Sequence, residues 1–419
     1  MSRPLSPRLP LSTPALAADN PPVAVSLPLG RAAFALALLL GLQPIATDVY
    51  LPALPQLTKA LAAPMALSQL TMSALILAFG IAQLAWGPVA DRFGRRPVLL
   101  AGLALFALCG FGSALAPRVE VLIGWRALQG VALASAVVCA RAMVRDLYEP
   151  VNGARVMSLA MSGLAVIAIG GPTLGGAVAA AFGWRGTLVL VGLAGLAALA
   201  YVGWQLPETV RRRNPAATHA GPLARNWSAM LRHPVFRAWT LLIACTYGGL
   251  FTILAASPFV YIEVLGLSSA AYGLTLAWGG GVYLISTFVG RRWIHRHGMA
   301  GAVTRGAAFT LAGGALALVA TRVESGALWW LLAAHGLYSF GHGMHQPCGQ
   351  AGAVGPFPQA AGAASALAGF VLAIVAFAIG LALGAALDGT VRPLAYGIAF
   401  WAAATAAVAW TLVRRHVAQ

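Results

Sequence analysis

The sequence predicts an all-α integral membrane protein in which twelve transmembrane helices form two six-helix bundles around a central cavity. Three observations carry this prediction: the composition, a series of long apolar runs, and one polar stretch that divides the series in half. Of the 419 residues, 60% are hydrophobic and only 9% are charged, against roughly 25% charged in an ordinary soluble domain. The mean hydropathy of +0.81 excludes soluble enzymes and nucleic-acid-binding modules.

The apolar runs have the length that a helix needs to cross a hydrocarbon core of ~30 Å, about 20 residues. They are roughly twice as long as a barrel strand requires, and they do not alternate polar with apolar residues. They predict helical spans over residues 32–54, 67–89, 98–116, 121–142, 156–182, 187–206, 238–260, 269–290, 302–321, 327–347, 362–386 and 394–413.

The basic residues orient these spans. Most of them fall in the segments that are cytoplasmic if the N-terminus is cytoplasmic, such as 92–96 and 211–213. The positive-inside rule therefore places both termini in the cytoplasm. Because the same distribution accounts for the net charge of +17, we expect no nucleic-acid partner. No signal-length apolar run precedes residue 31, so the first residues are expected to be a tail rather than a signal peptide.

The longest polar stretch separates six spans from six. We therefore predict an N-terminal cytoplasmic tail (1–30), a first bundle (31–206), a cytoplasmic linker (207–237), a second bundle (238–413) and a C-terminal tail (414–419). The basic turn 92–96 is echoed at 291–296, and the small residues of the fifth span are echoed by Gly380 and Gly384 in the eleventh. Such echoes suit a transporter built from two parallel repeats.

Asp48 is the only one of the ten acidic residues that lies clearly within a span. An intramembrane carboxylate is costly unless it faces water or a partner, which makes Asp48 a candidate for proton or substrate coupling. Burial disfavours the ionised form, a property that a proton carrier needs. The alternative is a residue that only caps the outer end of the helix. The neighbouring Pro44, Pro52 and Pro55 interrupt the helical hydrogen bonds, as often happens beside a cavity.

Arg126 lies inside the fourth span and must also find an acceptor within the bundle. Asp48 is one possible partner, and backbone carbonyls are another. Gln129 lies three residues further along the same helical face and is expected to extend the polar network. A purely structural role for Arg126 stays open at this point.

The short loop between the second and third spans is a candidate gate. Its glycine and proline residues permit a tight turn, and its single carboxylate can form charge-assisted bonds with neighbouring guanidinium groups. The alternative is that these arginines serve only the positive-inside rule. The residues that we assign to this gating loop are Gly87, Asp91, Arg92, Gly94, Arg95 and Arg96.

The fifth span places Pro172 among closely spaced glycines, namely Gly171, Gly175 and Gly176. A helix of this composition can pack backbone to backbone against its neighbour and rock or seal there. Close packing alone would use the same residues, so both interpretations remain.

Three histidines, His335, His342 and His345, lie in the tenth span. A metal site or proton relay is a minor alternative, since no cysteine, aspartate or further histidine pair is spaced to complete a ligand set. The four cysteines have neither paired nor zinc-ligand spacing. We therefore predict no metal site.

These motifs resemble those of the major facilitator superfamily (MFS), and within it those of the Bcr/CflA branch of drug:proton antiporters (DHA1, with twelve spans). Residues 87–96 resemble the loop signature between the second and third spans, and Gly171 to Gly176 resembles the fifth-span antiporter motif of drug exporters. Further matches lie at 47–55 (TDVYLPALP), 126–130 (RALQG), 206–209 (LPET) and 257–261 (SPFVY). The resemblance covers most of residues 31–413.

The resemblance implies the MFS fold and a multidrug efflux antiporter of the bacterial inner membrane. Such a protein exports amphipathic antibiotics by alternating access, driven by the proton gradient, with no cofactor and as a monomer. It implies a proton or substrate role for Asp48, coupling through Arg126, a gating contact between Asp91 and Arg95, and an antiport-type helix contact at Gly171 and Pro172. Some relatives carry a second acid where this chain has Leu40.

Two rival functions remain. One is an MFS facilitator or exporter for a metabolite or nutrient of the sugar, amino acid or siderophore class. The other is a non-transporting sensor or scaffold, disfavoured because the short tails and linker offer no output domain. An enzyme is not expected, because no nucleophile, base and orienting group lie at one membrane depth.

Overall fold

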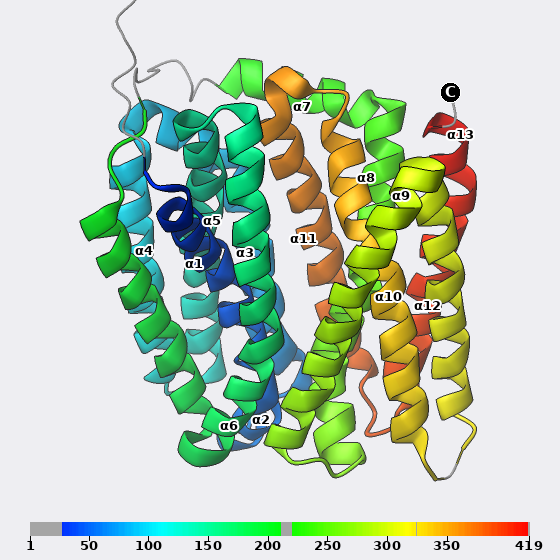
Figure 1. The fold of residues 1–419 in the computed structure, drawn as a ribbon. Helices are drawn as coiled ribbons and strands as arrows, with labels where there is room; N and C mark the ends of the chain where they lie inside the picture. Colours follow the sequence, from blue (N-terminus) through cyan, green and yellow to red (C-terminus); the bar gives the residue numbers. More distant parts are fainter. Residues whose placement is uncertain (1–26, 211–219, 324, 418–419) are drawn as a thin grey trace, which may run out of the picture.

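The computed structural model describes residues 27–210, 220–323 and 325–417, and these residues form helices without a β-strand among them. The predicted tail residues 1–26, the linker residues 211–219 and the last two residues lie outside the described part. Figure 1 shows a bundle of long, roughly aligned helices, with α7 and the C-terminal helix at the same end of the molecule. We call this end the α7 end and the opposite end, where α2 lies, the α2 end.

The helices of the first half follow the predicted spans closely. Their bounds are α1 Leu29–Asp48, α2 Leu54–Ala60, α3 Met65–Phe93, α4 Arg95–Ala114, α5 Val119–Leu147 and α6 Pro150–Gln205, with a short 3₁₀ turn, η1, over Leu51–Ala53 between α1 and α2. Helix α1 therefore stops at Asp48 in the proline-rich stretch. The helix cannot continue regularly there because proline supplies no backbone N–H.

The second half repeats this plan. Its helices are α7 Ala220–Arg232, α8 Pro234–Pro258, α9 Ser269–Ala320, α10 Ala327–Val354, α11 Ala361–Ala386, α12 Arg392–Val408 and α13 Arg414–Val417. Two short π-helical segments, η3 Phe259–Val264 and η5 Ala409–Val413, and one 3₁₀ turn, η4 Pro358–Ala360, complete it. Helix α7 lies within the predicted linker, a stretch whose polar sequence does not predict a helix. Its Trp227 and Met230 pack against the apolar core of the second half.

Twelve spans are recovered once two long helices are divided. Nine helical segments of the described residues are long and apolar enough to cross a membrane. Two of them, α6 and α9, are each a pair of spans that turns at a glycine with positive φ, Gly183 (70°) and Gly298 (68°). The one span still missing from this count is α10. Its 28 residues include histidine and glutamine, and it packs against α8 and α9. The fold is thus an all-α membrane bundle of twelve transmembrane helices.

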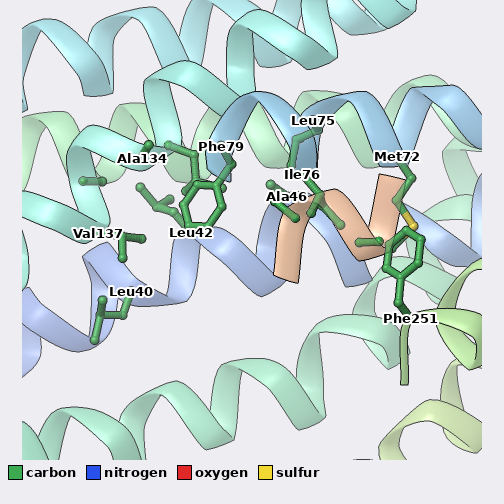
Figure 2. Packing of buried hydrophobic residues seen from close by; sticks show 14 of the residues in the cluster. Leu40, Leu42, Ala46, Met72, Leu75, Ile76, Phe79, Ala134, Val137 and Phe251 are labelled. Atoms are coloured by element: carbon green, nitrogen blue, oxygen red, sulfur yellow. The ribbon is translucent and has the colours of Figure 1, made fainter. Parts of the chain in front are cut away.

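The core of each half is apolar, and the two cores meet. Figure 2 shows Leu42 of α1, Ile76 and Phe79 of α3 and Val137 of α5 packed together, with Phe251 of α8 next to Met72. In lipid, close van der Waals packing rather than the hydrophobic effect holds helices together, so interfaces favour small residues. Two seams join the halves: α3 packs against α11, and α6 packs against α9.

The echoed glycines lie on these two seams. On the first seam, Gly380 and Gly384 of α11 lie against Ser73 and Ala66 of α3, and a Cβ added to Gly384 would come within 2.7 Å of the Ala66 Cα. On the second seam, Gly176 of α6 lies against the backbone at Ser269. The two small-residue clusters therefore permit backbone-to-backbone contact between the halves.

Candidate functional site

Asp48 is the last residue of α1 and stands where that helix breaks. The hydroxyl of Thr47 donates a hydrogen bond to its carboxylate at 2.7 Å, and its side chain is only partly buried. Tyr247 of α8 and Tyr272 of α9 lie close enough to interact electrostatically with this charge. The carboxylate of the first half therefore lies within the electrostatic reach of two helices of the second half.

Arg126 of α5 is fully buried, and its guanidinium is held by neutral acceptors. It donates to the backbone oxygen of Ala46 at 2.6 Å, to the side-chain oxygen of Gln129 at 2.6 Å and to the backbone oxygen of Thr71 at 3.4 Å. The sequence left two kinds of partner open for Arg126, namely Asp48 and backbone carbonyls. In the structure Arg126 bonds to backbone carbonyls. No ion pair between Arg126 and Asp48 occurs among the described residues.

These contacts fasten the end of α1. Ala46 lies two residues before Asp48, so the bond from Arg126 fixes the backbone that carries the carboxylate. The guanidinium also lies over the ring of Tyr50, 4.7 Å from its centroid, and the Tyr50 hydroxyl shares a 2.6 Å hydrogen bond with Thr71 of α3. A desolvated cation over an aromatic face is a favourable contact. Arg126 thus contacts the residues two positions before and two positions after Asp48.

Gln129 extends this network as its spacing predicts. It accepts from Arg126 and donates through its side-chain nitrogen to the backbone oxygen of Phe106 in α4, at 3.3 Å. A buried polar network is stabilising when each member has a partner. Helices α1, α3, α4 and α5 are therefore tied together at the level of Arg126.

The glycines of the fifth span pack against Val49, the residue that follows Asp48. A Cβ added to Gly175 would lie 2.7 Å from the Cα of Val49, the residue after Asp48, and one added to Gly171 would lie 3.6 Å from the Val49 side chain. On the other side, a Cβ added to Gly273 of α9 would lie 2.5 Å from the backbone oxygen of Pro172 and 3.0 Å from the Cα of Thr173. The fifth span is thus wedged between the Asp48 segment and the second half.

The loop between α3 and α4 is the centre of a charged cluster at the α7 end. The Arg95 guanidinium pairs with Asp91 at 3.0 Å and with Asp146 of α5 at 2.5 Å, and Thr209 donates to Asp146 at 3.0 Å. Gly94 turns the chain with φ 104°, a conformation that other residues rarely adopt. The expected contact between Asp91 and Arg95 is therefore present.

The remaining loop residues have different environments. Gly87 has room for a side chain, the nearest atom to an added Cβ being a Val138 methyl at 4.0 Å. Arg92 lies over the ring of Phe93. Arg96 donates from its side chain to the backbone oxygen of Gly203 at 2.8 Å.

Glu208, which follows α6, binds the loop between α3 and α4. Its carboxylate accepts from the backbone N–H groups of Arg95 at 3.0 Å and Arg96 at 3.3 Å, and also from Thr209 and Val210. Partial burial acts to raise the pKa of Glu208, but these four bonds outweigh it and hold the pKa below its usual 4.5. The ionised carboxylate therefore fastens the α3–α4 loop to the end of the first half.

We expect Glu208→Gln to lower the melting temperature of the purified protein by about 2 °C at pH 7, because the amide accepts more weakly than the carboxylate. A group with a depressed pKa in the folded state stabilises the fold above its unfolded pKa and loses this effect as pH falls through the folded value. The wild-type melting temperature should thus drop on acidification below pH 4.5. The variant should show a smaller drop, and identical pH profiles would contradict the assignment. Glu120→Gln, at an exposed position in α5, is the control.

The three histidines do not assemble a metal site. His342 and His345 each share a hydrogen bond with the Thr246 hydroxyl, at 3.0 and 3.3 Å, and His345 also bonds to the backbone oxygen of Val303. His335 is buried separately against Gly279. Among the described residues, no group of three or more histidine, cysteine or acidic side chains is placed to hold a metal ion.

The two ends of the molecule differ in how the halves meet. At the α2 end they are joined by Lys59 to Glu263 at 3.0 Å, by Gln69 to the backbone oxygen of Ala255 at 2.9 Å, and by the glycine contacts of both seams. At the α7 end, cavities of about 730 and 540 Å³ lie between the halves. The described conformation is closed at one end and hollow at the other.

Four residues of this site were not singled out from the sequence. Asp146 and Thr209 complete the Arg95 cluster, and Thr209 entered the sequence analysis only within the motif at 206–209. Tyr247 and Tyr272 of the second half lie within electrostatic reach of Asp48. The position of Asp146 and Thr209 at the ends of predicted spans near the basic loop was a signal for the first two, but nothing in the spacing indicates the tyrosines.

Comparison with known proteins agrees with these features. The Major Facilitator Superfamily profile matches residues 36–381. The chain is 29% identical to the multidrug resistance protein D of Escherichia coli over 80% of this chain and 83% of that protein. It is 26% identical to a bicyclomycin resistance protein homolog of Haemophilus influenzae, covering 83% and 86% of the two chains.

The fold has a counterpart among solved structures. A partially occluded inward open conformation of the xylose transporter XylE from E. coli superimposes with a TM-score of 0.72 at 15% identity, covering 93% of this chain and 98% of that one. At this identity the likeness concerns the fold alone. From its twelve spans, its motifs and these matches, the chain is a multi-pass membrane protein that belongs to the Major Facilitator Superfamily.

Proposed function

We propose that this protein is a proton-coupled multidrug efflux antiporter of the bacterial inner membrane, which exports amphipathic compounds by alternating access. The observation that carries the proposal is the placement of Asp48. It is a partly buried carboxylate at a helix break, with Thr47 on one side and tyrosines of the opposite half within electrostatic reach. Two relatives are named as a multidrug resistance protein and a bicyclomycin resistance protein homolog, and these names support a drug as the cargo.

The geometry supports alternating access in the following way. Among the described residues, the α2 end is held by backbone contacts at glycines, by the ion pair of Lys59 with Glu263, and by hydrogen bonds from Gln69 to Ala255 and from Gln56 to Ser269. These are few polar contacts, and an ion pair near the surface is worth little, so the halves can separate here at modest cost. With the termini in the cytoplasm, the hollow α7 end is the inward-facing side, from which cargo enters. Protonation of Asp48 removes the charge that faces the second half, and this favours a different packing of α1 against α8 and α9.

The proposal is tested in proteoliposomes that contain the purified protein and an internal pH-sensitive dye. We expect a panel of amphipathic antibiotics to evoke proton movement opposite to drug movement under an imposed proton gradient. Liposomes without protein are the control. Proton movement that no drug evokes, together with drug uptake that ignores the gradient, would contradict antiport and favour the facilitator alternative.

A further inference from the structure

The larger cavity between the halves contains two arginines without a carboxylate partner. It measures about 730 Å³ and is lined by the end of α5 and the start of α6 on one side, and by the end of α10 and the start of α11 on the other. Arg141 and Arg145 both face it from α5. Within the described residues, no carboxylate oxygen lies within 4.0 Å of either guanidinium.

Three neighbouring acids are already engaged elsewhere, and Glu149, exposed four residues after Arg145, forms no ion pair among the described residues. Asp91 and Asp146 both pair with Arg95, and the Glu208 carboxylate accepts from backbone N–H groups. Among the described residues, Arg141 donates only to the Ser365 hydroxyl of α11, at 3.2 Å. Arg141 is partly buried, and such a charge normally has a partner of opposite sign, whereas Arg145 is exposed. Two like charges one helical turn apart repel each other, so the α5 wall of the cavity is positive.

The remaining wall adds one unmatched polar atom and an apolar surface. Gln350 on α10 lines the cavity, and its side-chain oxygen is buried without a hydrogen-bond partner among the described residues. Met157, Met161 and Val354 supply apolar and adaptable contacts, as methionines do in sites that accept varied ligands. A buried acceptor without a donor is costly, so Gln350 would gain a hydrogen bond by turning its oxygen toward a donor in the cavity.

We propose that this cavity binds the cargo as an amphipathic organic anion: a carboxylate, sulfonate or phosphate group held by Arg141 and Arg145, an apolar body against the methionines, and a neutral N–H or O–H group that donates to Gln350. Guanidinium groups match such anions with two parallel hydrogen bonds. The volume is typical of a pocket for a drug-sized ligand. This inference rests on the proposed function and names a class of substrate for it.

The cavity joins both halves, so an occupant would act on the transport cycle. Arg141 and Arg145 belong to the first half, while Gln350 and Ser365 belong to the second. An anion bound between them draws the two halves together at the α7 end, which is the movement that closes an inward-facing cavity. A ligand shifts such an equilibrium only as far as it binds one state better than the other.

A matched pair of fluorescent probes tests the site in nanodiscs of phosphatidylcholine. The first probe is 8-anilinonaphthalene-1-sulfonate, which combines a sulfonate, an aromatic body and an N–H donor. The second is N-phenyl-1-naphthylamine, the same molecule without the sulfonate. We expect the double variant Arg141→Gln/Arg145→Gln to weaken binding of the sulfonate at least about tenfold, as expected for the loss of charge-assisted hydrogen bonds. Binding of the neutral probe should change by less than about twofold, because its apolar contacts are kept.

Controls separate the possible outcomes. Arg322→Gln removes the same charge at an exposed position of the α2 end and should leave both affinities unchanged. Equal weakening of both probes, or unchanged sulfonate binding in the double variant, overturns the proposal. Phosphatidylglycerol in the nanodiscs should not compete with the sulfonate. Competition that disappears in the double variant would assign the site to a lipid headgroup and overturn its role as a cargo site.

The binding measurement is independent of coupling, because no proton gradient is applied. Arginine-dependent sulfonate binding in a protein that moves no protons would therefore retain the anion site and reject the antiporter. Proton-coupled drug efflux with unchanged sulfonate binding in the double variant would retain the antiporter and reject the anion site.

Discussion

Asp48→Asn is expected to reduce drug-dependent proton movement in proteoliposomes to the level of protein-free liposomes, while the protein stays folded. Asparagine has almost the size of aspartate and can still accept the hydrogen bond from Thr47, so the end of α1 should keep its structure. It cannot take up a proton, and a carrier that does not titrate cannot couple drug to proton movement. Proton flux, drug flux and the size-exclusion profile are measured on the same preparation.

Glu120→Gln is the matched acid-to-amide control, at an exposed position of α5 far along the chain from the α1 break. It should transport as the wild type does. Equilibrium drug binding to Asp48→Asn separates a proton role from a substrate role: retained binding with lost coupling assigns the proton to Asp48, and lost binding assigns the substrate. Proton flux equal to that of the wild type would reject Asp48 as the coupling residue.

The second large effect is expected at Gly175. Gly175→Ala places a methyl group 2.7 Å from the Val49 Cα, a distance too short for two carbons in van der Waals contact. Because backbone atoms cannot rotate away, α6 must move off the segment that carries Asp48. We expect drug efflux to fall at least about tenfold, since a misplacement of the order of 1 Å costs that much at a working site.

Gly170→Ala gives the comparison, because no atom lies within 4 Å of its added Cβ. It makes the same chemical change five residues earlier on the same helix and should leave both the yield of folded protein and efflux unchanged. If the two variants behave alike, the close approach between α6 and Val49 is not required for transport. Efflux and the monodisperse fraction on size exclusion are recorded for each.

Together these sites form one connected unit. Arg126 holds the backbone two residues before Asp48, and Gly175 packs against the residue after it. The next contact from α6 leads to Gly273 of α9, in the second half. Two packings of this segment would thus change the contact between the halves, which is the kind of two-state element that coupling requires.

The sequence by itself determined the spans, because the length and apolarity of a membrane helix are local properties of the chain. Even the two merged helices, α6 and α9, turn at Gly183 and Gly298 within one or a few residues of the predicted span ends. The unusual side chains were equally visible, since a charge such as Asp48 or Arg126 inside an apolar run is costly and therefore rare. The amphipathic helix α7 was missed because it lies in a polar stretch and gains stability from packing Trp227 onto the second half.

Only the tertiary structure decided which groups meet. Arg126 could have paired with Asp48, and the sequence left this open because helical spacing does not fix contacts between different helices. Folding gave Arg126 three neutral acceptors, gave Arg95 two carboxylates, and left Arg141 and Arg145 facing a cavity with none. The physical reason is that a hydrogen bond or ion pair acts over a few ångströms, whereas Ala46 and Thr71 lie 80 and 55 residues from Arg126, and Asp146 lies 51 residues from Arg95.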